Sequence, residues 1–325
     1  MNIFITGGSG FIGSSLIDAL LKRGHCLTIL TRFPKKCDRL INVSGVSLLE
    51  GDPSKKGDWQ NYVSGNQCLI NLAGESIFSR WTEKRKQLIW ESRVFTTRNL
   101  VEALEEERGK DISLFSASGA GYYGFSGNQD FHEKMGPGSD FLADLAKEWE
   151  NEAAKASKKG IRVISMRLGM VLGKNGGGLA RMLPFFRCGI GGRIGDGNQW
   201  ISWIHIKDLV NALLFLINKP SLSGPVNFTS PNPLRNRDLV KSLAAALHRP
   251  AFLPIPGLMI KLVGGDLAEA LLNGQRVFPE KLLENGFTFS FPEIDGALGN
   301  LLENKKTILY KTDDSVKKHH KGEGF

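Results

Sequence analysis

The sequence has few cysteines and no long apolar run, two features that mark particular classes of protein. Its four cysteines form no CxxC pair and no metal-ligand spacing, which indicates reduced thiols in a cytoplasmic protein rather than disulfides or a metal site. No stretch approaches the roughly 20 apolar residues that a membrane span needs, so we expect no membrane partner. The first apolar run, residues 2–6, is already strand-like and leaves no room for a signal or transit peptide.

The formal charge of +9 comes from 42 Lys and Arg residues against 33 Asp and Glu residues. This balance permits binding of anionic ligands. The basic residues are scattered, however, and no recognition helix or aromatic-plus-basic RNA motif is present, so no nucleic-acid partner is expected. Part of the excess lies in residues 303–325, a tail with few apolar residues after Tyr310. We expect this tail to be disordered.

Apolar runs and helical patterns alternate along the first half of the chain. Strands are expected at residues 2–6, 26–31, 46–50, 67–72, 112–117 and 161–168, and helices at 11–23, 82–107 and 140–158. This alternation predicts an α/β protein, with a Rossmann-type doubly wound parallel sheet over residues 1–173. Beyond it the sequence is rich in glycine and proline, which predicts a smaller α+β C-terminal lobe over 174–302, with a strand near 225–228. The ligand cleft is expected between the lobes, beyond the carboxyl ends of the strands.

The strongest local motif is TGGSGFIG at residues 6–13, between the first expected strand and the first expected helix. In a Rossmann βαβ unit, Gly7 allows the tight turn, Gly10 lets the backbone approach a pyrophosphate, and Gly13 allows the helix to pack closely on the strand. Phe11 and Ile12 open the helix, whose free N–H groups and positive end hold the anion. The motif predicts a dinucleotide cofactor.

The end of the second expected strand indicates which dinucleotide binds. An acidic residue there would accept the ribose 2′-hydroxyl of NAD, but the chain has Thr31 and Arg32, followed by Lys35 and Lys36. A guanidinium beside the ribose suits a 2′-phosphate, both as a bidentate donor and as a stacking plane. We therefore predict NADP(H) as the cofactor; the alternative is that Arg32 is a solvated turn residue.

The motifs TGGSGFIG, NLAGE at 71–75 and SASGAGYYG at 116–124 make the chain resemble the extended short-chain dehydrogenase/reductases, also called the NAD-dependent epimerase/dehydratase superfamily. Longer stretches at 81–104, 167–209 and 271–298 are similar to its atypical branch, usually labelled "epimerase family protein", which ends in a small C-terminal domain of unknown function. The resemblance covers residues 1–302. It implies an oxidoreductase or epimerase that acts on a small carbonyl or alcohol substrate.

The resemblance also implies further cofactor contacts. Leu72, Ala73 and Gly74 stand in the place of the family's Asn-Ala-Gly turn, which lines the adenosine-side ribose and phosphates. Asp52 would approach the adenine; the alternative is a turn-forming Asp before Pro53.

Other residues are implied with rival roles. Arg93 would reach toward the cofactor from the long helix, or else form a surface pair with Glu91 or Glu102. Ser116 would lie close to the cofactor, and Met170 would flank its nicotinamide end. Glu75 and Arg80 are candidate polar contacts near the nicotinamide side, with capping and surface pairing as the alternative.

The catalytic residues are where the sequence departs from the family. In working members a Ser orients the substrate, and a Tyr four residues before a Lys passes the proton. Ser118 stands in the Ser position, but 25 residues further on the Tyr position holds Ala143, followed by Lys147. No other register restores the pair, because no Tyr occurs between residues 124 and 309.

Three interpretations stay open. In the first, Tyr122 or Tyr123 supplies the hydroxyl from the loop beside Ser118, with packing at the edge of the sheet as the alternative role. In the second, His205 is the donor, since an ordinary histidine pKa is near ~6.5, although in relatives this stretch docks the lobes. In the third, the protein binds NADP(H) without turnover as a sensor or scaffold, a role that division-linked labels of some relatives support. Many relatives dimerise through two long helices, so a homodimer through 82–107 and 140–158 is also expected.

Overall fold

The computed structural model describes residues 1–105, 112–125, 127–251 and 253–303. Residues 304–325 of the tail that we expected to be disordered lie outside these ranges. Seven parallel strands form a central sheet in the order β11-β7-β5-β4-β1-β2-β3. They are β1 (Asn2–Thr6), β2 (Cys26–Thr31), β3 (Val46–Glu50), β4 (Cys68–Asn71), β5 (Ser113–Gly119), β7 (Arg162–Leu168) and β11 (Gly224–Phe228). The predicted α/β class and parallel sheet are confirmed.

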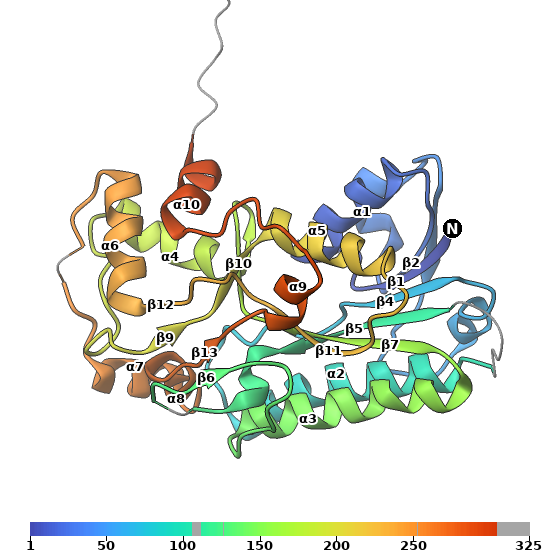
Figure 1. Ribbon diagram of the computed structural model, residues 1–325, viewed down its shortest axis with the longest axis horizontal. Coiled ribbons are helices and arrows are strands. Elements are labelled where there is room, and N and C mark those ends of the chain that lie inside the picture. Colours follow the sequence, from blue (N-terminus) through green and yellow to red (C-terminus); the bar gives the residue numbers. More distant parts are fainter. Residues whose placement is uncertain (106–111, 126, 252, 304–325) are drawn as a thin grey trace, which may run out of the picture.

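Helices cover both faces of this sheet (Figure 1). One face carries α1 (Phe11–Leu21) and α5 (Ile206–Ile217), and the other carries α2 (Glu83–Glu102) and α3 (Phe141–Ala154). The side chains of β1 alternate between these faces, as the strand period requires. Ile3 and Ile5 enter the apolar cluster with α1 and α5, whereas Phe4 enters the cluster with α2 and α3. Strand order reverses between β1 and β4, which places the ligand crevice beyond their carboxyl ends.

Local capping explains where the two long helices start. The Thr82 hydroxyl accepts a hydrogen bond from the Arg85 N–H at 3.2 Å, and the Asp140 carboxylate accepts from two N–H groups in the first turn of α3. The helix expected over 140–158 ends as an α-helix at Ala154 and continues as a 3₁₀ helix (Lys155–Lys159), which Gly160 ends with φ +81°. In the described part of the chain, no helix combines the length and apolar character that crossing a membrane requires.

The smaller lobe is built from short strand pairs and helices. Two of the pairs are β8 (Met170–Gly173) with β10 (Trp203–His205), and β9 (Trp200–Ile201) with β12 (Leu234–Arg235). Trp203, fully buried, lies in a core formed with α4 (Gly177–Arg187), α6 (Asn236–Leu247) and α10 (Ile294–Leu302). The remaining strands and α-helices of the described residues are β6 (Asp130–Phe131), β13 (Arg276–Val277), α7 (Gly257–Gly264), α8 (Leu267–Leu272) and α9 (Glu280–Glu284).

The division between the lobes does not follow one point in the sequence. The strand predicted near 225–228 is present as β11, yet it pairs with β7 at the edge of the central sheet. The helix before it, α5, packs with α1. Residues 206–228 therefore belong with the Rossmann unit rather than with the C-terminal lobe. These residues join the Rossmann unit because α5 is apolar over most of its length, and packing on the sheet next to α1 buries its apolar side chains.

Candidate functional site

The glycine loop follows β1 at the carboxyl edge of the sheet and leads directly into α1. Gly7 has φ +71°, and a Cβ there would lie 2.6 Å from the carbonyl carbon of Leu72. A Cβ at Gly13 would lie 2.5 Å from the carbonyl oxygen of Gly7, so only glycine lets the helix start this close to the strand. Gly10 is the N-cap and has no side chain that could cap α1, so the first-turn N–H groups can receive an anion. This geometry fits a dinucleotide pyrophosphate.

The two residues that open α1 use their side chains for packing. A Cβ at Gly173 or at Gly176 would lie 2.4 Å from the ring of Phe11, so this ring fills the glycine turn between β8 and α4. Ile12 packs against the core between the sheet and α1. Both residues can offer a cofactor their backbone N–H groups, and Phe11 also docks the smaller lobe onto the start of α1.

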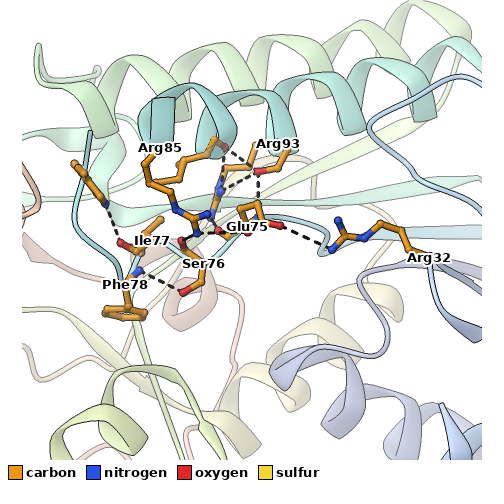
Figure 2. Close-up of polar contacts among 10 residues, drawn as sticks. Arg32, Glu75, Ser76, Ile77, Phe78, Arg85 and Arg93 are labelled. Atoms are coloured by element: carbon orange, nitrogen blue, oxygen red, sulfur yellow. Dashed lines mark hydrogen bonds and ion pairs between the residues drawn. The ribbon is translucent and has the colours of Figure 1, made fainter. Parts of the chain in front are cut away.

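Arg32 and Glu75 meet across the end of β1 (Figure 2). Arg32 follows β2 and Glu75 follows β4, and these two strands flank β1 in the sheet. Arg32 Nη2 lies 3.8 Å from Glu75 Oε1, and Nη2 of Arg85 on α2 lies 3.4 Å from Glu75 Oε2. The Arg32 side chain is 56% exposed. Arg32 therefore keeps a largely solvated side chain, with the Glu75 carboxylate within ion-pair distance of it.

The backbone of Glu75 is anchored by α2. Its N–H donates to the Ser92 hydroxyl at 3.0 Å, and its carbonyl oxygen accepts from Arg93 Nη2 at 2.9 Å. The Arg93 guanidinium lies against Gly74, where a Cβ would be 3.2 Å from its Cζ atom, and it stacks over the Trp149 ring at 5.4 Å. Burial lowers the pKa of Arg93 to about 10, although the charge of Glu75 opposes this shift.

Arg93 thus supports the turn at 72–75 from the side of α2. Its alternative surface partners are engaged elsewhere, since Glu91 accepts from Gln87 and Glu102 pairs with Lys56. Leu72 and Ala73, in the same turn, lie beside β1: the Leu72 N–H donates to the Thr6 carbonyl at 3.1 Å, and the Ala73 N–H donates to the Thr6 hydroxyl at 3.4 Å.

Thr31 and Asp52, two other predicted cofactor residues, form turns at this edge. The Thr31 hydroxyl accepts from the Phe33 N–H at 3.3 Å and so shapes the turn that presents Arg32. The Asp52 carboxylate accepts from the N–H and the hydroxyl of Ser54 at 3.0 and 2.7 Å, which is the turn-forming role given above as its alternative.

Ser116 and Met170 lie deeper and further toward the smaller lobe. Ser116 is 1% exposed, and its hydroxyl accepts from Asn71 Nδ2 at 3.4 Å beneath the turn after β4. The Met170 sulfur lies 2.7 Å from the place of a Cβ at Gly178, against α4. Met170 therefore sits where the two lobes meet.

Ser118 and Tyr123 belong to one buried polar network at the ends of β5 and β7. The Ser118 hydroxyl donates to Glu150 Oε1 at 2.7 Å, and Arg167 donates to both oxygens of Glu150 at 2.8 and 2.9 Å. Arg167 Nη1 also donates to the Tyr123 hydroxyl at 2.9 Å, which in turn donates to Asn227 Oδ1 at 2.7 Å. Burial works against the charge of Arg167, but the bonds to Glu150 outweigh it and raise its pKa.

Tyr122 and Tyr123 stand differently toward this guanidinium. The Tyr122 ring is half-buried, and its centroid lies 3.5 Å from Arg167 Cζ. Tyr123 is only 3% exposed, and burial raises its pKa to about 12, although Arg167 pulls in the opposite direction. The structure thus gathers Ser118, Tyr122 and Tyr123 around a single buried cation.

The other candidate donors are placed away from such a role. Ala143 is fully buried and Lys147 is exposed on α3, so the positions of the family's Tyr and Lys bring no hydroxyl to the crevice. His205 is 2% exposed; its Nδ1 accepts from the Lys207 N–H at 3.0 Å, and its ring stacks on Phe291 at 4.1 Å. Burial lowers the pKa of His205. His205 caps α5 and joins the lobes, as its alternative role supposed.

Glu150 and Arg167 belong to the site, although neither was predicted as a site residue from the sequence. A signal was available for Arg167, which is a charged residue between Met166 and Leu168 near the end of β7 and is 2% exposed. Such a residue requires a buried partner. The sequence gives no comparable signal for Glu150, because other charged residues of α3 face solvent and nothing in the sequence distinguishes Glu150 from them.

A groove of about 720 Å³ lies beside β7 and β11, with Ser157, Ser165 and Pro225 among its lining residues, and it reaches Glu150 of the polar network. It faces the amino-terminal halves of β7 and β11, whereas ligands of open α/β sheets bind beyond the carboxyl ends. The groove is therefore not the cofactor crevice. Over the described residues, no group of three or more His, Cys, Asp or Glu side chains is arranged to hold a metal ion.

The sheet, the glycine loop and the crevice between β1 and β4 define a Rossmann-type nucleotide-binding protein. A sequence profile described as the NAD dependent epimerase/dehydratase family matches residues 3–227, and one described as a domain of unknown function (DUF1731) matches residues 255–301. The chain belongs to the NAD dependent epimerase/dehydratase family.

Full-length relatives support this assignment. Epimerase family protein YfhF of Bacillus subtilis is 35% identical over 309 residues, which are 95% of this chain and 100% of the relative. The chloroplastic epimerase family protein SDR39U1 homolog of Arabidopsis thaliana is 37% identical over 308 residues, 93% of this chain and 87% of the relative. The crystal structure of human epimerase family protein SDR39U1 (isoform 2) with NADPH matches with a TM-score of 0.82 at 32% identity, over 94% of this chain and 100% of that one. The resemblance inferred from the motifs is confirmed.

Proposed function

We propose that the protein is an NADP(H)-dependent oxidoreductase or epimerase that acts on a small carbonyl or alcohol compound. The observation that carries the proposal is Arg32, which stands at the end of β2, where NAD-binding relatives of this fold carry an acid. Its side chain is 56% exposed, and its guanidinium contacts only Glu75 at 3.8 Å and the Phe33 ring at 5.8 Å among the described residues, so it can turn to a 2′-phosphate. The presence of NADPH in a structural relative at 32% identity supports the same cofactor here.

The remaining cofactor contacts follow from the crevice. The first turn of α1 and the loop from Gly7 to Gly10 would hold the pyrophosphate, and the turn at 72–74 would line the adenosine ribose. The nicotinamide, when bound, supplies hydride transfer. The contribution of the protein is to bind and orient both reactants and to move a proton at a side-chain hydroxyl.

We assign that hydroxyl to Tyr122. Ser118 and Tyr123 are buried, and their hydroxyls donate to Glu150 and Asn227. Tyr122 is half-buried, and Arg167 fixes its ring from one side. A general acid must reach the reacting atom, which favours the more accessible phenol.

A second candidate function is NADP(H) binding without turnover, as a sensor or scaffold. The burial of Ser118 and Tyr123 favours it, together with the replacement of the family's Tyr by the buried Ala143. Both candidates require the same cofactor site, so cofactor binding and turnover are to be measured separately.

Cofactor preference is tested by titrating NADPH and NADH into the wild-type protein and into Arg32→Ala. We expect NADPH to bind at least about tenfold more weakly to the variant and NADH to change by less than about twofold, because charge-assisted bonds to phosphate contribute roughly 1.5–3 kcal/mol. Arg23→Ala removes one exposed positive charge at the far end of α1 and serves as the matched control. An unchanged preference for NADPH in Arg32→Ala would overturn the assignment.

Catalysis is tested by following NADPH oxidation across a panel of small carbonyl compounds. Turnover that is lost in Tyr122→Phe and kept in Tyr62→Phe, an exposed tyrosine elsewhere, supports an enzyme with Tyr122 as donor. Tight NADPH binding with no turnover on any compound supports the sensor or scaffold. Full activity in Tyr122→Phe would remove Tyr122 from the mechanism.

A further inference from the structure

Glu75 places a carboxylate beside the guanidinium that the proposed function assigns to the 2′-phosphate (Figure 2). One oxygen lies 3.8 Å from Arg32, and the other lies 3.4 Å from Arg85. Because the N–H and carbonyl of Glu75 are both hydrogen-bonded to side chains of α2, the carboxylate starts from an anchored backbone. Its position is a property of the fold rather than of a loose surface loop.

The contact occupies the place where dinucleotide specificity is decided. Arg32 and Glu75 follow the two strands that flank β1, whose carboxyl end leads into the glycine loop, and they approach each other to 3.8 Å. In Rossmann proteins that use NAD, an acid at the end of β2 accepts the ribose 2′-hydroxyl, and in those that use NADP an Arg accommodates the 2′-phosphate. Here β2 supplies the Arg, and the loop after β4 supplies an acid within ion-pair distance of it. Glu75, which was expected near the nicotinamide side, lies instead beside the residue assigned to the adenosine ribose.

We propose that Glu75 is a specificity-determining residue, which competes with the 2′-phosphate for Arg32 and accepts the ribose hydroxyl of NAD(H). The inference rests on the proposed function, because it requires a dinucleotide in this crevice. A 2′-phosphate that binds Arg32 displaces the carboxylate, which keeps Arg85 as its partner. A ribose without the phosphate leaves the pair between Arg32 and Glu75 in place and donates to the carboxylate. The protein therefore takes both dinucleotides, and Glu75 limits its preference for NADP(H).

The decisive variant is Glu75→Gln, which keeps the size of the side chain and removes its charge. We expect NADPH to bind about threefold to fivefold more tightly, since an exposed ion pair that no longer competes is worth up to ~1 kcal/mol. We expect NADH to bind about fivefold more weakly, because a hydroxyl donates less strongly to a neutral oxygen than to a carboxylate. The ratio of the two dissociation constants should then change by more than about tenfold.

The matched control is Glu102→Gln, which removes one charge from an exposed ion pair with Lys56 at the other end of α2. Calorimetric titrations with both dinucleotides are made on the wild type and both variants. Opposite shifts for NADPH and NADH in Glu75→Gln, with neither in Glu102→Gln, support the proposal. A loss of equal size for both dinucleotides would show a purely structural role and overturn it, as would an unchanged ratio. A wild-type protein that binds neither dinucleotide would refute the proposed function itself, which separates the two failures.

Discussion

Removing the Glu150 carboxylate should destabilise the protein severely. Glu150 is the acidic partner of Arg167, which is only 2% exposed and donates to both carboxylate oxygens at 2.8 and 2.9 Å. Two further hydrogen bonds of this guanidinium go to the Tyr123 hydroxyl and the Glu133 carbonyl at 2.9 and 3.4 Å. Neither can neutralise its charge. Glu150→Ala would leave a buried, uncompensated cation and the Ser118 hydroxyl without its acceptor.

The expected loss in the free energy of unfolding is about 3–5 kcal/mol, the cost of breaking a buried ion pair by deleting one partner. It is a large share of the total for a folded domain, which is roughly 5–15 kcal/mol. Urea unfolding followed by circular dichroism measures it as a lower midpoint at an unchanged slope. Glu148→Ala, two residues earlier on α3, is the control and should stay within about 0.5 kcal/mol, because the bond from Asn151 to Glu148 is long at 3.4 Å and exposed.

A double variant tests the physical reason. Glu150→Leu combined with Arg167→Met removes both charges, so its destabilisation should be smaller than the sum of the single changes by more than about 1 kcal/mol. A loss below about 1 kcal/mol in Glu150→Ala would refute the reasoning, since it would mean that water or another acid already compensates Arg167.

Three further predictions concern other parts of the molecule. Burial raises the pKa of Tyr123 from 10.0 to about 12, so its protonated form is favoured in the folded state. This preference contributes up to about 3 kcal/mol to the free energy of unfolding; the contribution is complete below pH ~10 and is lost as the pH rises toward ~12. Tyr123→Phe should therefore flatten the alkaline limb of a curve of stability against pH. Gly13→Ala places a Cβ 2.5 Å from a backbone atom, so it should lower the free energy of unfolding by about 1–3 kcal/mol and remove most of the affinity for NADPH. Gly299→Ala in α10 places a Cβ with nothing within 4 Å of it, so this variant should be neutral or stabilising in the same denaturation assay. The homodimer proposed through α2 and α3 would cover Leu88 and Phe95, which are 42% and 36% exposed. Light scattering should then show a dimer that Phe95→Asp converts to a monomer. A monomeric wild-type protein would contradict the proposed dimer.

The central strands could be predicted because they carry their signal locally. A strand buried on both faces, such as Cys68–Asn71, reads as a short apolar run between turn residues. The glycine loop is equally local, since its spacing serves one turn and one helix start within eight residues. The predicted role of Arg32 depends only on its place directly after such a strand. By contrast, β11 looked like part of the smaller lobe, because a strand's sequence does not say which sheet it will join.

Local sequence patterns were therefore enough to predict six of the seven strands of the sheet, the long helices on its faces and the glycine loop. Which side chains meet depends on the folded arrangement: Glu75 with Arg32, 43 positions away, and Ser118 with Glu150 and Arg167. The physical reason is that periodicity and turn chemistry act over a few neighbouring residues, whereas these contacts depend on strand order. Parallel strands that are distant in the chain bring their carboxyl ends to one edge of the sheet. Which charged side chains pair there therefore depends on the order of the strands in the sheet and not on the distance between the residues in the sequence.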